Sequence, residues 1–265
     1  MQREPRQREV AVVTGGGQGI GRAITERLLG DDRAVVVIEL HDEQLEWLDE
    51  AISESRAWVV VGDAGDDAVA ARAVAAAESL GALTGWVNNA AVFRDAWLHE
   101  AGGAAVAELV RRNLQPCLAG SAAAVAAFRV QGVAGSIVNI SSHQAQRAVR
   151  GALPYATAKA AIEGLTRALA VDYGPWSVRV NALALGSIAT ERLQALEDSG
   201  TAVYAQVEAA MQELHPLGRA GEAAEVADAV AFLLSEQSSF ISGAVLPVDG
   251  ARSAQGHDPE AVVPS

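Results

Sequence analysis

The chain has 265 residues, half of them hydrophobic and a fifth charged, which excludes a disordered protein and leaves enough length to bury the core of an α/β domain. Its formal net charge of -13, with arginines scattered along the chain, disfavours nucleic acid and anionic membranes as partners. A single cysteine, Cys117, excludes an internal disulfide, and five scattered histidines offer no zinc-ligand spacing, so we expect no metal and a reducing, cytoplasmic setting.

Charged residues open the chain, and the apolar run that follows them is too short for a signal-peptide core. Short apolar runs then alternate with longer helical patterns. The runs that predict strands are residues 10–13, 34–38, 58–61, 85–87, 136–140, 178–182 and 244–248. Because most are continuously apolar, they are typical of strands covered by helices on both faces. The pattern predicts a doubly wound α/β sandwich with a seven-stranded parallel sheet.

We expect one domain over residues 1–265, because no linker or repeat interrupts this rhythm. The tails, about 1–8 and 254–265, have the composition of disordered termini. Between the sixth and seventh strands, residues 188–214 predict a second helical stretch with a break at 197–200. We interpret residues 187–215 as a lid over a substrate.

A glycine-rich turn, GGGQGIG at residues 15–21, joins the first strand to a helix. Such a turn lets the backbone approach a pyrophosphate, while the N-terminus of the helix supplies N–H donors and positive potential. A flexible loop is the alternative on glycine spacing alone. The candidate dinucleotide-binding residues of the turn are Gly15, Gln18, Gly19, Ile20 and Gly21.

Glu39 ends the second strand, where a carboxylate can accept hydrogen bonds from a ribose 2′-hydroxyl and would repel a 2′-phosphate. The sequence therefore favours NAD over NADP, although a solvated strand end is the plainer interpretation of Glu39. A P-loop is excluded, because the turn lacks the Gly-Lys-Ser/Thr ending.

Tyr155 and Lys159 stand four residues apart on a predicted helix over residues 154–173, so their side chains share a face. A phenol has a pKa near 10, and a neighbouring cation favours the phenolate that proton transfer near neutral pH requires. Lys159 is the only lysine of the chain. Because arginine carries every other permanent cation, an ammonium at this position favours a catalytic pair over a solvated helix face.

The fifth predicted strand runs into Ser141 and Ser142. Ligands of parallel α/β sheets lie at the carboxyl ends of the strands, so either hydroxyl can donate to a substrate oxygen there. On their own, two serines at a strand end are more often turn formers.

These residues resemble the short-chain dehydrogenase/reductase family, over about residues 9–252. TGGGQGIG at 14–21, NNA at 88–90 and YATAK at 155–159 are similar to its three signature motifs. The resemblance implies a Rossmann-type three-layer α/β/α fold and interconversion of a secondary alcohol and a ketone with a nicotinamide cofactor. It also implies a homotetramer.

The resemblance assigns catalysis to four residues. Ser142 lies thirteen residues before Tyr155, the family's usual separation, so the resemblance selects Ser142 over Ser141. Lys159 would also bind the nicotinamide ribose. Asn113 would hold a water that links Lys159 to solvent, whereas without the resemblance it is a hydrogen-bonding residue inside a helix.

The resemblance extends the cofactor site. Asp63 and the Ala64 backbone would bind adenine, and the segment that contains Ile188 and Thr190 would cup the nicotinamide. The remaining residues that it implies are Asn89, Gly186, Tyr155 and Lys159. Leu185 replaces the family's proline, which predicts a looser loop on the nicotinamide side, and Ala251 replaces a glycine.

Two alternatives stay open. One is an NADPH-dependent 3-oxoacyl carrier-protein reductase, which Glu39 disfavours because no arginine at position 18 or 40 would meet a 2′-phosphate. The other is a catalytically retired nucleotide-sensing regulator, which the intact catalytic set disfavours. Substrate identity is not predicted, but several polar or aromatic residues follow the serine and NNA motifs and are candidates to border the pocket. These are His143, Gln144, Arg147, Arg150, Arg94, Trp97 and His99.

Overall fold

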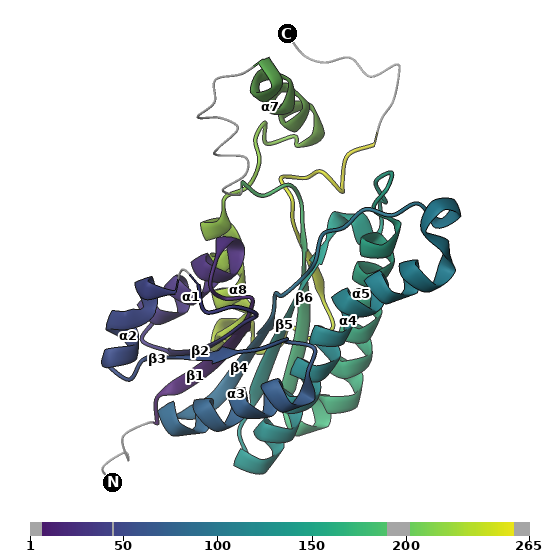
Figure 1. Cartoon of the computed structure of the whole chain (residues 1–265). Helices are drawn as coiled ribbons and strands as arrows, with labels where there is room; N and C mark the ends of the chain where they lie inside the picture. Colours follow the sequence, from purple (N-terminus) through teal and green to yellow (C-terminus); the bar gives the residue numbers. More distant parts are fainter. Residues whose placement is uncertain (1–6, 44, 190–201, 257–265) are drawn as a thin grey trace.

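The computed structural model describes residues 7–43, 45–189 and 202–256 (Figure 1). Seven parallel strands form one sheet in the order β3-β2-β1-β4-β5-β6-β7, which confirms the predicted sheet. The strands are β1 Glu9–Thr14, β2 Ala34–Glu39, β3 Ala57–Val61, β4 Ala82–Asn88, β5 Gly135–Ser142, β6 Val178–Leu185 and β7 Val245–Val248. Five of them are buried along almost their whole length, as continuously apolar strands between two helical layers should be.

Helices cover both faces of the sheet (Figure 1). The helices of one face are α1 Gly19–Gly30, α2 Asp49–Ser53 and α8 Ala223–Leu234, and those of the other are α3 Asp67–Leu80, α4 Leu98–Gln131 and α5 Leu153–Tyr173. Two apolar cores result, one centred on Ile24 and Val230 and the other on Ala73 and Phe128. Among these described helices, none is long and apolar enough to cross a bilayer.

The segment between β6 and α8 differs from the prediction of a helical stretch that starts at Ile188. Ile188 forms a parallel β-bridge with Gly221, and the described helix, α7 Ala202–Leu214, starts later. β-branched Ile188 suits this extended backbone better than a helix. Thr190 and the break at 197–200 lie outside the described residues. Figure 1 shows α7 beyond the carboxyl ends of the strands.

The order of the strands reverses at β1, which has β2 on one side and β4 on the other. Connections from the ends of β1 and β4 therefore leave toward opposite halves of the sheet and open a crevice at its carboxyl edge. The glycine turn after β1 and the Asn88-Asn89 pair at the end of β4 border this crevice.

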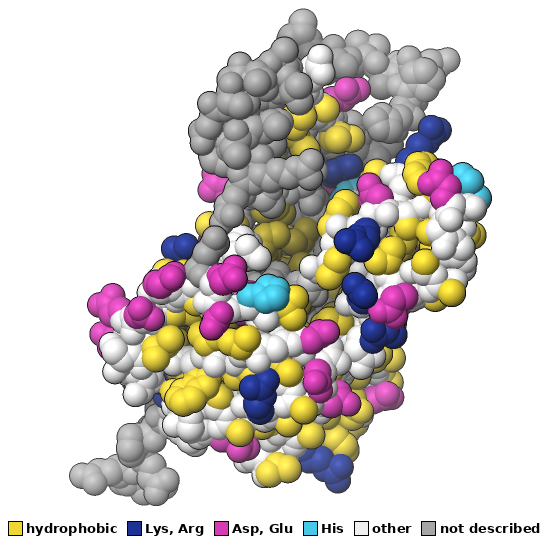
Figure 2. Space-filling model, viewed as in Figure 1, with side chains coloured by type: hydrophobic (Ala, Val, Ile, Leu, Met, Phe, Trp, Pro, Cys, Tyr) yellow, Lys and Arg dark blue, Asp and Glu magenta, His cyan; other side chains and the backbone are white. Residues whose placement is uncertain are grey.

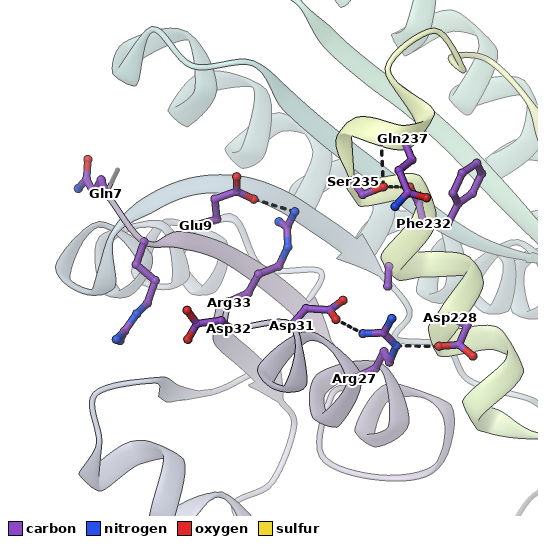
Figure 3. Close-up of a pocket in the computed structure, with 12 residues that line it drawn as sticks. Gln7, Glu9, Arg27, Asp31, Asp32, Arg33, Asp228, Phe232, Ser235 and Gln237 are labelled. Atoms are coloured by element: carbon purple, nitrogen blue, oxygen red, sulfur yellow. Dashed lines mark hydrogen bonds and ion pairs between the residues drawn. The ribbon is translucent and has the colours of Figure 1, made fainter. Parts of the chain in front are cut away.

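The opposite, amino edge of the sheet is held by arginines. Arg27 of α1 bonds the carboxylates of Asp31 and Asp228, and Arg33 pairs with Glu9 at 2.7 Å (Figure 3). These pairs line a cavity of about 830 Å³. Arg27 and Arg33 already have carboxylate partners, and Arg8 donates to Ser55 O, so we assign this larger cavity no chemistry.

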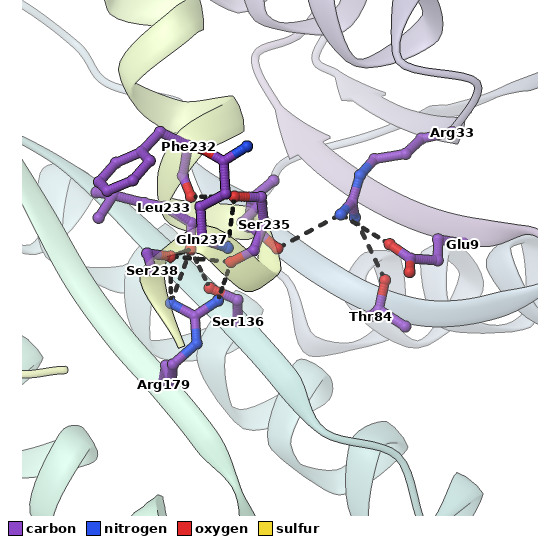
Figure 4. Close-up of polar contacts among 11 residues, drawn as sticks. Glu9, Arg33, Thr84, Ser136, Arg179, Phe232, Leu233, Ser235, Gln237 and Ser238 are labelled. Carbon is purple, nitrogen blue, oxygen red and sulfur yellow. Dashed lines mark hydrogen bonds and ion pairs between the residues drawn. The ribbon is translucent and has the colours of Figure 1, made fainter. Parts of the chain in front are cut away.

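Arg179 of β6 supports the same edge at the C-terminus of α8 (Figure 4). Its guanidinium donates to Leu233 O at 2.9 Å, Ser235 O at 3.1 Å and Ser238 Oγ at 2.9 Å. The last carbonyls of a helix have no partners within the helix, and Arg179 supplies donors for two of them.

Candidate active site

A cavity of about 730 Å³ lies at the carboxyl edge, beside the glycine turn. It brings together most residues predicted to bind a cofactor. These are Gly15, Gln18, Ile20, Gly21, Glu39, Asp63, Ala64 and Asn89. Gly19 is not among the residues that line it, and Gly186 and Ile188 lie beyond it, after β6.

The turn needs glycine for two reasons: a side chain would clash at one position, and the backbone is left-handed at others. A Cβ on Gly21 would lie 1.8 Å from Gly15 O, and Gly15 and Gly19 have φ of +62° and +52°. Nothing lies within 4 Å of the position that a Cβ on Gly19 would take, so open space adjoins the N-terminus of α1. This cradle fits a pyrophosphate that accepts N–H groups of the helix start.

Asn89 stabilises this turn from β4. Its Nδ2 donates to Thr14 O at 3.1 Å and Gly15 O at 3.0 Å, and its N–H donates to Thr14 Oγ1 at 2.9 Å. The family's asparagine motif therefore acts here on the shape of the cradle, by joining the ends of β1 and β4.

Glu39 borders the same cavity and lies against the glycine turn. Its carboxylate accepts from Gly17 N at 3.0 Å and Leu40 N at 3.1 Å, which holds it at the end of β2. Acidic side chains gather over the neighbouring α2 side of the molecule (Figure 2). Glu39 therefore adds a carboxylate to the border of the cavity.

Asp63 follows β3, and its Oδ1 accepts from Gly65 N at 2.8 Å. Two arginines that sequence reasoning missed line the same cavity, Arg111 and Arg112 of α4. Both donate to Glu108, at 2.8 and 3.0 Å. They occupy one helical turn with Glu108, so only the packing of α4 across the sheet edge shows that they border the cavity.

The predicted catalytic residues meet next to this cavity. Ser142 ends β5, and Tyr155 lies in the first turn of α5. Burial raises the pKa of Tyr155, while its hydrogen bond with Ser142 lowers it. The ring of Phe93, largely exposed, lies 4.9 Å from the Tyr155 ring and forms an apolar wall beside the phenol.

Ser141 and Ser142 have different surroundings, because successive residues of a strand face opposite sides. Ser141 Oγ donates to Lys159 O at 3.4 Å and Glu163 Oε1 at 3.3 Å, so it is directed at α5. Ser142 Oγ accepts from Gln144 N and bonds Tyr155. The structure therefore pairs Ser142 with the phenol.

Lys159 is 2% exposed, one turn after Tyr155. Its Nζ donates to Ile140 O at 2.7 Å and lies 5.3 Å from the centre of the Tyr155 ring. Burial lowers the pKa of Lys159, and burial raises the pKa of the neighbouring Cys117 thiol to about 11. A buried ammonium with one described protein partner has donors left for a ribose hydroxyl or a water.

Asn113 is buried within α4. Its Oδ1 accepts from Val92 N at 2.9 Å, and its Nδ2 donates to Leu109 O at 3.0 Å. The Asn113 side chain therefore connects α4 to Val92, which lies in the loop after β4 and directly precedes Phe93. The pattern of the sequence gives no signal for this contact.

β6 ends at Leu185, which stands in place of the family's proline, and the loop begins with Gly186. Gly186 N donates to Val248 O at 3.0 Å, and Ser187 N donates to His215 Nε2 at 3.2 Å. The described start of this loop therefore has backbone partners at Gly186 and Ser187, and the looser loop stays a prediction. A Cβ on Gly186 would lie 2.7 Å from Asp249 Cα, which explains glycine there.

His143 follows Ser142 and is buried. Burial, followed by the charge of Arg252, lowers the pKa of His143 to about 4 from its ordinary 6.5. As pH falls, the His143 imidazole is therefore protonated in the unfolded chain before it is protonated in the folded protein. The contribution of His143 to the free energy of unfolding is lost as pH falls from 6.5 through about 4.

Replacing His143 with glutamine should reduce the loss of unfolding free energy across this pH window, by on the order of 1 kcal/mol. Urea unfolding at pH values above and below the window measures the difference. His99→Gln, at an exposed position, is the matched control. If the wild type and His143→Gln lost the same free energy of unfolding across the window, its assignment to His143 would be wrong.

The arginines predicted to border the substrate pocket, Arg94, Arg147 and Arg150, are all exposed. Sequence reasoning missed Arg252, which is partly buried and donates from Nη1 to Ser187 Oγ at 2.8 Å. Its position directly after Ala251, where the family has a glycine, was the available signal.

Comparisons with known proteins agree with this geometry. A family model described as enoyl-(acyl carrier protein) reductase matches residues 15–251. The chain is 36% identical over 251 residues to 2-(S)-hydroxypropyl-CoM dehydrogenase 3 of Xanthobacter autotrophicus, covering 93% of this chain and 97% of that one. It is 37% identical over 249 residues to cis-4-hydroxycyclohexanecarboxylate dehydrogenase of Sinomonas cyclohexanicum, covering 92% and 96%.

A solved structure is similar as well. It is a gluconate 5-dehydrogenase from Burkholderia cenocepacia in complex with NADP and tartrate, 29% identical, with a TM-score of 0.81 over 96% of this chain and 98% of that one. With its glycine cradle, serine–tyrosine pair and buried lysine, the chain belongs to the short-chain dehydrogenase/reductase family and is a nicotinamide-dependent oxidoreductase of alcohols and ketones.

Proposed function

We propose that the protein oxidises a small secondary alcohol to a ketone with NAD as its preferred cofactor, and catalyses the reverse reduction. One observation carries the proposal: Ser142, Tyr155 and Lys159 meet at the carboxyl edge, beside a cavity with a glycine cradle and Glu39 at its border.

The residues have distinct roles in this mechanism. Ser142 Oγ donates a hydrogen bond to the substrate oxygen, and Tyr155 Oη, as the phenolate, takes the proton of the carbinol hydroxyl. The bound nicotinamide supplies the hydride acceptor. Lys159 Nζ favours the phenolate through its positive charge and binds the ribose hydroxyls, while Asn113 holds the water that connects Lys159 to solvent. In reduction Tyr155 returns the proton to the ketone oxygen.

The residues proposed to contact the cofactor line the cavity or lie beyond it, after β6. The N-terminus of α1 and its glycines would hold the pyrophosphate, and Asp63 with the Ala64 backbone would hold adenine. Glu39 would accept hydrogen bonds from the hydroxyls of the adenine ribose. Gly186 and Ile188 would lie on the nicotinamide side. Thr190, which the resemblance adds to them, is outside the described residues.

Replacing Glu39 with glutamine tests the preference for NAD. The neutral amide removes repulsion of a 2′-phosphate, so the ratio of NADPH to NADH dissociation constants should fall by about tenfold. Fluorescence titration of both reduced cofactors measures it, with exposed Glu50→Gln as the control. Tighter binding of NADPH than NADH by the wild type would reverse the assignment.

The proposed substrate is a hydroxylated molecule with an apolar face against Phe93. The relatives support this class, since one is named for a hydroxycyclohexanecarboxylate and another for gluconate. Sugars, hydroxy acids, cyclic alcohols and acyl thioesters should be screened with both cofactors. Fastest turnover of an acyl thioester with NADPH would favour the carrier-protein reductase, and binding without any turnover would favour a nucleotide-sensing regulator.

We further propose a single domain over residues 1–265, in which the described part of the segment 187–215 covers the substrate. The position of α7 beyond the carboxyl ends supports this cover. A cytoplasmic homotetramer is the proposed form, supported by family membership and the unpaired Cys117.

A further inference from the structure

Three neighbouring strands end together beside the substrate oxygen. Ser142 of β5 pairs with Leu185 of β6, and Leu185 pairs with Val248 of β7. The residues that follow these ends, among them Ser187 and Arg252, therefore share one edge of the sheet with the catalytic hydroxyl.

A tight turn after β7 determines where Arg252 lies. The Asp249 carboxylate accepts from Ala251 N at 3.1 Å and Ser253 N at 2.8 Å, and Arg252 N donates to Asp249 O at 3.0 Å. Gly250 and Ala251 have φ of +57° and +68°. Alanine is strained in the left-handed region, so the Asp249 carboxylate stabilises a turn that Ala251 disfavours.

The Asp249 carboxylate therefore bonds backbone N–H groups, and no ion pair between it and Arg252 is present. The Arg252 guanidinium, partly buried, donates from Nη1 to Ser187 Oγ. Among the residues that the structure describes, no carboxylate lies within 4.0 Å of it, whereas Arg27, Arg33 and Arg219 each have one. Four of its five N–H donors are thus without a described side-chain partner.

Arg252 also lies near the reacting groups. Its charge is one cause of the lowered pKa of His143, and His143 directly follows Ser142. Arg252 is partly buried and is anchored by a neutral hydroxyl, and the charge of Asp249 acts on it without an ion pair. Such a cation, close to the substrate oxygen, can donate to an anion.

We propose that Arg252 binds a carboxylate of the substrate, so that the enzyme acts on hydroxy acids. The position of the substrate rests on the proposed function. Neighbouring strands lie about 5 Å apart, so a carboxylate near Ser187 is roughly 5–10 Å from the hydroxyl at Ser142. The carbinol and the carboxylate are therefore several bonds apart, as on opposite sides of a six-membered ring, and an α-hydroxy acid is too short.

Binding of cyclohexanecarboxylate and cyclohexanecarboxamide tests this without turnover. Both are titrated calorimetrically onto the wild type and Arg252→Gln, with and without NAD. The wild type should prefer the carboxylate, and Arg252→Gln should weaken it tenfold to a hundredfold while leaving the carboxamide unchanged. Arg252→Lys should retain part of the preference, because it keeps the charge but loses the planar fork.

Arg167→Gln, an exposed substitution on α5, is the matched control for charge. Equal weakening of both ligands in Arg252→Gln, or a wild type that prefers no carboxylate over its amide, overturns the proposal. A protein that binds the carboxylate selectively but oxidises no alcohol would refute the proposed function and leave this site standing.

Discussion

Replacing Tyr155 with phenylalanine should lower kcat by about 1000-fold, within the range that general acid–base catalysis contributes. The substitution removes only the hydroxyl, so the ring keeps its contact with Phe93. The dissociation constant of NADH should stay within about twofold, since no described contact with the cradle is lost. Initial rates with the best alcohol of the screen and a cofactor titration measure both quantities.

Tyr173→Phe is the matched control for that experiment. Tyr173 ends the same helix and packs against Trp176, away from the carboxyl edge. It should retain wild-type kcat. Undiminished turnover in Tyr155→Phe would remove the phenol from the mechanism, and loss of NADH binding would instead indicate a structural role.

Replacing Lys159 with methionine should lower kcat by about 100-fold and move the pH profile. A nearby cation favours the phenolate, so its removal raises the pKa of Tyr155 and shifts the ascending limb of kcat/KM to higher pH. Methionine has similar length and fits a buried site, which limits structural damage. Initial rates from neutral to alkaline pH measure the shift.

The variant Lys159→Arg distinguishes the effect of the positive charge at position 159 from the effect of the side chain's shape. Arginine keeps the positive charge but places a planar fork in a site that is 2% exposed, where Nζ reaches Ile140 O. We expect a similar fall in kcat with a pH profile closer to that of the wild type. An unshifted profile in Lys159→Met would show that Lys159 acts only through packing or ribose binding.

Burial of Lys159 also predicts an effect on stability. Its pKa is lowered in the folded protein, so the unfolded chain holds the proton more tightly. The contribution of Lys159 to the free energy of unfolding therefore rises with pH up to its ordinary pKa of 10.5. Lys159→Met should show less of this rise in urea unfolding.

Local pattern was sufficient for the elements of this fold. Apolar runs indicated all seven strands, and most were continuous because five strands lie buried between two helical layers. The glycine turn needed only its own spacing, and Tyr155 and Lys159 needed only the helical repeat that puts i and i+4 on one face. The helical pattern failed at Ile188, where pairing with Gly221 decided the conformation.

The sequence by itself determined the strands, the glycine spacing of the turn and the phenol–ammonium pair, since each depends on neighbours within a few residues. Only the tertiary structure decided that Ser141 is directed at α5, that Asn113 ties the loop at Val92, and that Arg252 reaches Ser187. Those contacts join residues 21 to 65 positions apart. Such pairs meet because parallel strands end at a common edge, and the spacing of residues along the chain does not show which of them will lie close together there.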